Sequence, residues 1–132
     1  MRRTHPMPET SYRVGRASAG LGLFATAPIE PGEYIEYVGE IISDQEANHR
    51  KNNRYLFEIN TKWTIDGSNR ANKARYINHS CHPNCESLVQ HKRVFVKAIR
   101  QIEPGEELTY DYGAEYVDEF IAPHGCKCSA CS

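Results

Sequence analysis

The chain has 132 residues, of which 39% are apolar and 25% charged, a composition that fits one folded globular domain and argues against wholesale disorder. Its net charge of −1 provides no general attraction to nucleic acid, and no apolar run reaches the roughly 20 residues that cross a bilayer. We therefore expect a soluble, intracellular protein, of the nucleus or the cytoplasm, that binds neither nucleic acid nor a membrane directly.

The pattern of residues along the chain is that of short strands. Residues 1–11 are rich in Pro, Thr and charge without periodicity, so we expect a flexible N-terminal arm. From Tyr12 to Ser43, short β-branched and aromatic runs alternate with Gly and Pro, which predicts strands joined by tight turns. Further strands are predicted at 55–59, 63–65, 94–96 and 108–110. One short polar helix is expected over residues 43–52, with Ser43 or Asp44 as its N-cap.

The pentapeptide Ile-Glu-Pro-Gly-Glu occurs twice, at residues 29–33 and 102–106, each time just before a predicted strand. Pro fixes φ at the second position of a type II turn and Gly accepts the positive φ of the third, so we expect such a turn at both places. Because only five residues match, we prefer recurring turn chemistry to a duplicated domain as the interpretation.

Two segments contain groups that suit a binding site. Gly20 and Gly22 flank Leu21 in the segment GLGLFA, and such a pair lets backbone pass close to a ligand, although it also suits a plain turn. Residues 74–85, ARYINHSCHPNC, concentrate amide, imidazole, hydroxyl and thiol groups where no strand is expected. This segment is either a polar loop that satisfies buried backbone groups or part of a site.

The C-terminal third of the chain is acidic and carries a tyrosine pair. Tyr110 and Tyr112 stand two residues apart, so in a strand both side chains would face one way, into the core or into a site. The acidic residues form either a solvated face or an acidic lip beside a site for a cationic peptide; they are Glu106, Glu107, Asp111, Glu115, Asp118 and Glu119.

Six motifs together resemble the SET-domain protein lysine methyltransferases. In chain order they are GLGLFA, EYVGE, YLF, ARYINHSCHPNC, EELTYDYG and CKCSAC, and the resemblance extends from residue 12 to residue 131. It implies a β-clip fold of small curved sheets with few short helices, in which the C-terminal segment threads the segment with Asn-His-Ser in a pseudoknot-like arrangement. We expect a flexible arm (1–11), a SET domain (12–114) and a post-SET zinc-binding segment (115–132).

The resemblance also implies a reaction and its methyl donor. The protein would be a protein-lysine N-methyltransferase that takes its methyl group from S-adenosylmethionine. Gly20, Leu21 and Gly22 would line this cofactor with their backbone, while Asn78 and His79 would hold its adenosine and amino-acid parts.

Three tyrosines would complete the catalytic site by the same resemblance. Tyr55 would border both the cofactor and the target lysine, and Tyr112 would be the catalytic tyrosine and a further contact of the cofactor. Tyr110 stands where family members carry Phe or Tyr, and because a hydroxyl and its water restrict the space there, we expect mainly monomethylation.

The chemistry of methyl transfer explains these residue types. The reaction is an in-line displacement from sulfonium to amine, so the enzyme needs alignment, a neutral amine and a dry channel. Tyrosine hydroxyls and backbone carbonyls hold the amine without adding a formal negative charge. The pKa of a lysine, ordinarily about 10.4, falls in such a site because desolvation and a neighbouring sulfonium disfavour the ammonium form. A dedicated strong base is therefore not required.

Three of the five cysteines lie within the last seven residues, a clustering that needs a chemical explanation. The resemblance implies a tetrahedral structural zinc site, with Cys85 left as a packed thiol; its ligands would be Cys81, Cys126, Cys128 and Cys131. The tail reads C-x-C-x2-C where the family has C-x-C-x4-C, so disulfides or unpaired thiols stay open as the alternative. A bound zinc would pin the tail over the cofactor and one wall of the lysine channel.

The substrate and partners follow less directly from the sequence. A histone or another basic protein tail is the expected substrate, and acidic residues near the site would attract it. The insert at residues 43–54, where relatives build much of their substrate groove, is short, so selection of the substrate is loose or depends on a partner, and a homodimer is conceivable. The alternatives are a non-catalytic SET-fold module that binds a peptide or scaffolds a complex, and a methyltransferase with another kind of acceptor.

Overall fold

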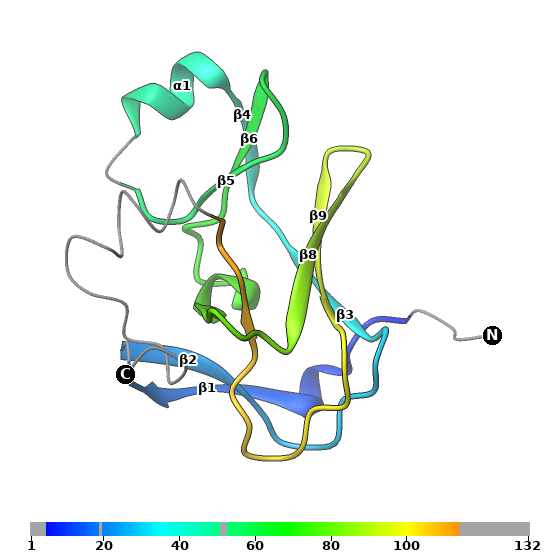
Figure 1. Cartoon of the computed structure of the whole chain (residues 1–132). Coiled ribbons are helices and arrows are strands. Elements are labelled where there is room, and N and C mark those ends of the chain that lie inside the picture. The colour runs from blue at the N-terminus through cyan, green and yellow to red at the C-terminus, as the bar shows by residue number, and fades with distance from the viewer. Residues whose placement is uncertain (1–4, 19, 51–52, 114–132) are drawn as a thin grey trace.

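The computed structural model of the chain describes residues 5–18, 20–50 and 53–113, which form a mainly β fold with few short helices (Figure 1). Within these ranges the strands form an antiparallel hairpin, a parallel pair and two antiparallel three-stranded sheets. The predicted mainly β fold of small sheets is therefore confirmed. The described residues include no helix that is long and apolar enough to cross a membrane.

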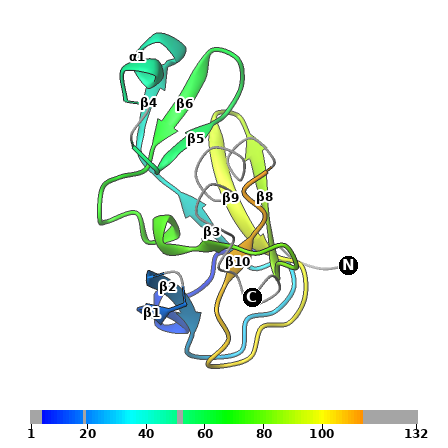
Figure 2. The same ribbon diagram turned by 60° about the vertical axis from the view of Figure 1, so that its left-hand side comes forward.

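Half of the six strand pairs in the described residues join strands that do not follow each other in the chain. In order of pairing the strands are β1 (Tyr12–Ala17) with β2 (Gly20–Ala25); β7 (Asn78–His79) with β10 (Thr109–Tyr110); β3 (Tyr34–Tyr37), β9 (Arg93–Ala98) and β8 (Cys85–Gln90); and β4 (Glu40–Ser43), β6 (Trp63–Asp66) and β5 (Leu56–Glu58). Figure 2 shows β10 in the middle of the molecule, between the β1–β2 hairpin and the β8–β9 pair. The parallel pairing of β7 with β10 is the part of the predicted threading that lies in the described residues.

Two strands lie where the sequence predicts none. β7 falls within the polar segment 74–85, and it forms because the distant strand β10 supplies its hydrogen-bonding partner. β8 lies at the edge of its sheet and buries only Cys85 well, so its side chains lack the apolar alternation that predicts a strand. Both elements are therefore products of tertiary pairing.

The predicted short helix is α1 (Asp44–His49), and Ser43 caps its N-terminus by accepting a hydrogen bond of 3.1 Å from the Glu46 amide. No residue of α1 is buried, so packing alone would not hold it in place. Arg50 fixes its C-terminal end by binding Glu46 on the helix and Asp66 on β6, each at 2.7 Å. Figure 1 shows α1 above the sheet of β4, β5 and β6.

Two residues of the predicted flexible arm, Met7 and Ser11, are buried against the domain, while the other described residues of the arm are exposed. Met7 is 5% exposed and belongs to the core, and its amide donates to the Tyr34 carbonyl at 2.7 Å. A 3₁₀ turn follows at η1 (Glu9–Ser11). A buried apolar side chain and a paired backbone fix this segment despite its polar, proline-rich composition.

The two Ile-Glu-Pro-Gly-Glu turns lie side by side. Ile29 and Ile102 exchange both backbone hydrogen bonds, at 2.9 and 2.8 Å, and both side chains are fully buried. Gly32 has φ of 96° and Gly105 has φ of 91°, and in each turn the last residue donates its amide to the carbonyl three residues earlier. The positive φ that the turn prediction requires at glycine is thus confirmed at both places.

Each turn is also hydrogen-bonded to the strand that leads into the other one. The Gly32 amide donates to the Ala98 carbonyl at 2.9 Å, and the Gly105 amide donates to the Ala25 carbonyl at 2.8 Å. Ala25 and Ala98 each stand four residues before the isoleucine of their turn, so the bonds cross in equivalent positions. The backbone bonds of the two segments are therefore related by an approximate two-fold axis, and both isoleucines belong to the core.

Candidate active site

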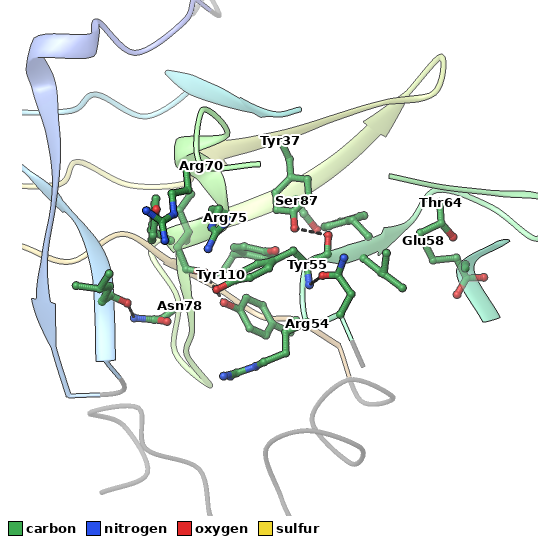
Figure 3. Close-up of a pocket in the computed structure, with 18 of the residues that line it drawn as sticks. Tyr37, Arg54, Tyr55, Glu58, Thr64, Arg70, Arg75, Asn78, Ser87 and Tyr110 are labelled. Atoms are coloured by element: carbon green, nitrogen blue, oxygen red, sulfur yellow. Dashed lines mark hydrogen bonds between the residues drawn. The ribbon is translucent and has the colours of Figure 1, made fainter. Parts of the chain in front are cut away.

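A cavity of about 1020 Å³ opens between the β1–β2 hairpin, α1, β5 and the β7–β10 pair (Figure 3). Six residues that the sequence predicts for the site line this cavity together; they are Gly20, Leu21, Tyr55, Asn78, Tyr110 and Tyr112. Of the other two predicted pocket residues, Gly22 lies beside Asn78, and His79 contacts the backbone of Tyr112. The fold thus brings these eight predicted residues, which are spread from position 20 to position 112 of the sequence, together in or beside one cavity.

The wall formed by β2 is open to a ligand. Gly20 has φ of 107°, and within the described ranges no atom apart from its chain neighbours lies within 4 Å of the position that a Cβ would take there. The Leu21 side chain is 57% exposed. Backbone at these two residues therefore reaches the cavity without a side chain in the way, which suits the close approach of a flat, polar ligand.

Asn78 places a polar amide in this wall. Its Nδ2 donates to the Leu21 carbonyl at 3.0 Å and to Glu107 Oε2 at 2.7 Å. Both partners are acceptors only, so the nitrogen side of the amide is fixed. The oxygen of the amide then points towards the cavity, on the side where Tyr55 and Tyr110 lie (Figure 3).

Aromatic rings form the floor of the cavity. The ring centroids of Tyr110 and Tyr112 are 4.8 Å apart, and Phe57 lies 6.4 Å from Tyr110 and 5.5 Å from Tyr37. The Tyr37 hydroxyl donates to the Tyr55 carbonyl at 2.7 Å, which ties the loop before β5 to the core. The predicted tyrosine pair does face one way, since both rings line the cavity and contact each other.

Tyr112 is held from two sides. Its hydroxyl donates to the Ile77 carbonyl, and its backbone amide donates to His79 Nδ1 at 3.1 Å. His79 is 8% exposed, and burial lowers its pKa while the more distant Asp111 opposes the shift. Because Nδ1 accepts, the neutral imidazole carries its proton on Nε2. A neutral, buried imidazole therefore positions the backbone of the tyrosine.

Basic side chains also line the cavity, and sequence reasoning did not identify them as residues of the site. The Arg75 guanidinium lies 4.2 Å from the Tyr55 ring centroid and 5.0 Å from that of Tyr76, and it donates to the Ser68 carbonyl. Arg54 and Arg70 also line the cavity. The position of Arg75 three residues before Asn78 was the available signal, since it starts the segment that enters the site.

The acidic residues do not act as one surface in the described residues. Glu106 pairs with Arg100 at 3.1 Å, while the Glu107 carboxylate turns to Asn78. The Asp111 side chain is 61% exposed. Glu115, Asp118 and Glu119 lie outside the described residues, so the acidic lip stays a prediction.

One of the four predicted zinc ligands lies in the described residues. Cys81 is exposed, and its Sγ is 3.6 Å from His79 Nε2. Cys85 is buried, and burial raises the pKa of its thiol to about 12. An exposed thiol can ionise and bind a metal more readily than a buried one, which fits the predicted choice of Cys81 over Cys85. Cys126, Cys128 and Cys131 lie outside the described residues.

Comparisons with known proteins agree with these features. The family model of the SET domain matches residues 20–113. The histone-lysine N-methyltransferase trithorax of Drosophila virilis is 41% identical over 85% of the chain, which covers 3% of that relative. The putative histone-lysine N-methyltransferase ASHH4 of Arabidopsis thaliana is 42% identical over 84% of the chain and 34% of its own length. A histone-lysine N-methyltransferase of Debaryomyces hansenii, named as specific for lysine 4 of H3, is 38% identical over 83% of the chain and 11% of its own length. The chain therefore spans at most about a third of these relatives.

Proposed function

The chain belongs to the SET-domain family, and from that premise we propose that it is a protein-lysine N-methyltransferase that uses S-adenosylmethionine as methyl donor. The observation that carries the proposal is the single cavity that combines an open glycine backbone, the Asn78 amide and a floor of tyrosines. These are the groups that hold a nucleoside amino acid and a long amine beside each other.

The residues of the cavity fit the methyl donor. Gly20 and Leu21 would contact it through backbone, and Asn78 would accept a hydrogen bond from it, because the amide oxygen faces the cavity. Gly22 and His79 would support this wall through Glu107 and through the backbone of Tyr112. When bound, S-adenosylmethionine supplies a methyl group on a positively charged sulfur.

The tyrosines prepare the acceptor. The lysine nitrogen needs a free lone pair, so its proton leaves to water before transfer, and the aromatic floor favours the neutral amine by excluding water. Tyr112 would orient the amine, with its ring fixed by Tyr110 and by the hydrogen bond to the Ile77 carbonyl. Tyr55, in the loop before β5, would border both the donor and the lysine.

We propose that the product is mainly monomethyl-lysine. Tyr110 is 6% exposed and is packed between Phe57 and Tyr112, so its hydroxyl occupies space that a second methyl group would need. The tight packing of these rings supports a small acceptor site.

We propose further that a post-SET segment, residues 115–132, follows the SET domain of residues 12–114 and binds zinc. Its Cys126, Cys128 and Cys131 would join Cys81, whose exposed thiol is consistent with a ligand from the domain. Four thiolates suit a tetrahedral structural zinc site.

The substrate is proposed to be a lysine in a basic protein tail such as that of a histone, which would place the protein at chromatin. The support is that the relatives are named histone-lysine N-methyltransferases. The cavity itself is lined by both acidic and basic residues, among them Glu58 and Arg54, so it does not select one tail by net charge.

The direct test is incubation of the zinc-loaded protein with isotope-labelled S-adenosylmethionine and a mixture of basic proteins, beside a Tyr112→Phe variant. Mass spectrometry should find labelled lysines with the native protein and far fewer with the variant. A protein that binds no methyl donor would favour the non-catalytic peptide-binding module. Methyl groups on acceptors other than lysine would exclude the proposed reaction.

A further inference from the structure

The orientation of the Asn78 amide depends on Glu107, a residue of the EELTYDYG motif to which the sequence analysis assigns no role in the site. Its Nδ2 has two acceptors, the Leu21 carbonyl at 3.0 Å and Glu107 Oε2 at 2.7 Å. The second contact is shorter and involves a carboxylate, which makes it the stronger of the two. Among the described residues, no side chain or backbone amide donates to Asn78 Oδ1. The oxygen is therefore the atom that the amide offers to the cavity.

The backbone of Glu107 is fixed independently of its side chain. Its carbonyl accepts a hydrogen bond of 2.8 Å from Asn84 Nδ2, and the Thr109 amide donates to Asn84 Oδ1 at 2.9 Å. Glu107 also forms a bridge with Phe24 on β2. Asn84 is 3% exposed, so this clamp lies inside the protein. The carboxylate therefore starts from a defined position beside β2.

The surface of β2 leaves space for this carboxylate only because a glycine stands there. A Cβ on Gly22 would lie 2.5 Å from Glu107 Oε2 and 3.0 Å from Ala17 Cβ. The first distance is too short for any side chain, so the carboxylate would have to move away. Gly22 thus reaches the site through Glu107, although it is absent from the residues that line the cavity.

We propose that Glu107 is a positioning residue that holds the Asn78 amide with its oxygen towards the cavity and thereby selects a methyl donor with an ammonium group at that point. This assignment rests on the proposed function. An acceptor oxygen with a carboxylate behind it favours a cationic donor such as the α-ammonium of S-adenosylmethionine. An analogue that carries hydrogen in place of this amine would leave Oδ1 unpaired and would bind more weakly.

The test compares two ligands and two matched variants by titration calorimetry. The ligands are S-adenosylhomocysteine and its deaminated analogue, which differ only in the amine. The variants are Glu107→Gln and Glu106→Gln, which remove the same charge from adjacent residues, and Glu106 pairs with Arg100 away from Asn78. We expect the native protein and Glu106→Gln to prefer the amine-bearing ligand equally, and Glu107→Gln to lose about tenfold of that preference, as expected for one charge-assisted hydrogen bond.

Turnover gives a readout that a general loss of structure would not produce. For Glu107→Gln, the KM for S-adenosylmethionine should rise about tenfold while kcat changes little, because the affected contact is made before and during transfer alike. Gly22→Ala keeps the charge but displaces the carboxylate, so it should lose the same preference between the two ligands. Its result decides the question if Glu107→Gln fails to fold.

The outcomes separate the two proposals. If the native protein binds S-adenosylhomocysteine and both variants keep its full preference for the amine, the assignment of Glu107 is wrong and the proposed function stands. If the native protein binds neither ligand, the proposed function is overturned and this assignment with it.

Discussion

The turns at residues 29–33 and 102–106 share a sequence and a backbone structure, yet they deliver different segments. The first leads into β3, whose Tyr37 fixes the loop before β5 through the Tyr55 carbonyl. The second leads through Glu107 into β10 and on to Tyr112. Tyr110 of β10 and Tyr112 line the cavity, and Glu107 supports it through Asn78. Tyr37 and Tyr110 follow the glycine of their turn at the same spacing, and both pack on Phe57. Two equivalent turns can therefore lead into segments with different roles, one that fixes a loop and one that we propose takes part in the reaction.

The largest effect should come from Tyr112, the residue that distinguishes the second segment most. We expect Tyr112→Phe to lower kcat by roughly 100-fold or more, because it removes the hydroxyl that we propose to orient the reacting amine. The melting temperature should change little by comparison. Quenched single-turnover assays measure the rate, and a rate within threefold of the native value would remove Tyr112 from the chemistry.

The second segment also leads towards the proposed metal site. Cys81→Ser should abolish the binding of one zinc ion, since a hydroxyl is a poor replacement for a thiolate. Cys85→Ser should keep the metal, because the buried Cys85 thiol has a pKa of about 12 and is not a proposed ligand. Elemental analysis of both purified variants gives the zinc content. Equal zinc in the two variants would contradict the choice of Cys81.

Substitution of the two turn glycines, Gly32 and Gly105, tests whether the two turns contribute equally to stability and to binding of the methyl donor. Gly32→Ala and Gly105→Ala should each destabilise the fold by about 1–2 kcal/mol, because alanine is strained at positive φ. Chemical denaturation measures both losses. Only Gly105→Ala should also weaken binding of the methyl donor, since its strain lies next to the segment with Glu107. Equal binding losses in both variants would show that the two turns act as one unit.

The matched tyrosines give a smaller and more specific contrast. Tyr110→Phe should shift products from mono- towards di- and trimethyl-lysine, because it frees space at the acceptor nitrogen. Tyr37→Phe should leave the products unchanged and cost about 1 kcal/mol of stability through the lost bond to the Tyr55 carbonyl. Mass spectrometry of a peptide time course distinguishes the two. Processive trimethylation by the native protein would refute the assignment of Tyr110.

The smallest expected effect is the loss of stability on substitution of Asp66, which lies on β6, the partner of β4. Burial alone would raise its pKa, but hydrogen bonds from Ser68, Arg50 and Asn53 outweigh this and hold the pKa below its ordinary value. Its stabilisation is thus present above the unfolded-state pKa of about 3.9 and is lost as the pH falls through the folded one. Asp66→Asn should cost less than about 1 kcal/mol at pH 7 and nothing at strongly acidic pH. Urea titrations across this range would reveal a cost that does not shrink.

Local features of the fold could be predicted from the sequence, and contacts between distant segments could not. Pro and Gly predict the turns at residues 29–33 and 102–106, and Ser43 predicts the start of α1. Turn formation and helix capping can be predicted because both depend on residues close together in the sequence. By contrast, β7 forms only by pairing with the distant strand β10, and the N-terminal arm is held by the burial of Met7 in the core. Such pairings have no local signal.

The candidate site divides in the same way. The resemblance selected Gly20, Tyr55, Asn78, Tyr110 and Tyr112, and all of them line one cavity. Glu107 was noted in the acidic run and in the EELTYDYG motif, but without a role in the site, since its partner Asn78 is 29 residues away in the chain. The acidic run suggested that Glu107 belongs to a charged surface, whereas in the structure its carboxylate accepts a hydrogen bond from the Asn78 amide.

The crossed hydrogen bonds of the two turns have a consequence for synthesis on the ribosome. Ile29 and Gly32 are bonded to Ile102 and Ala98, so the hydrogen bonds that fix the first turn on the rest of the domain cannot form until these later residues have been made and have left the exit tunnel. Until then β3 lacks its partner β9, whereas β1 with β2, and β4 and β5 with β6, can pair within the N-terminal half. We infer that this domain folds late in synthesis or after release, and that a nascent chain stalled before Ala98 is a substrate for chaperones.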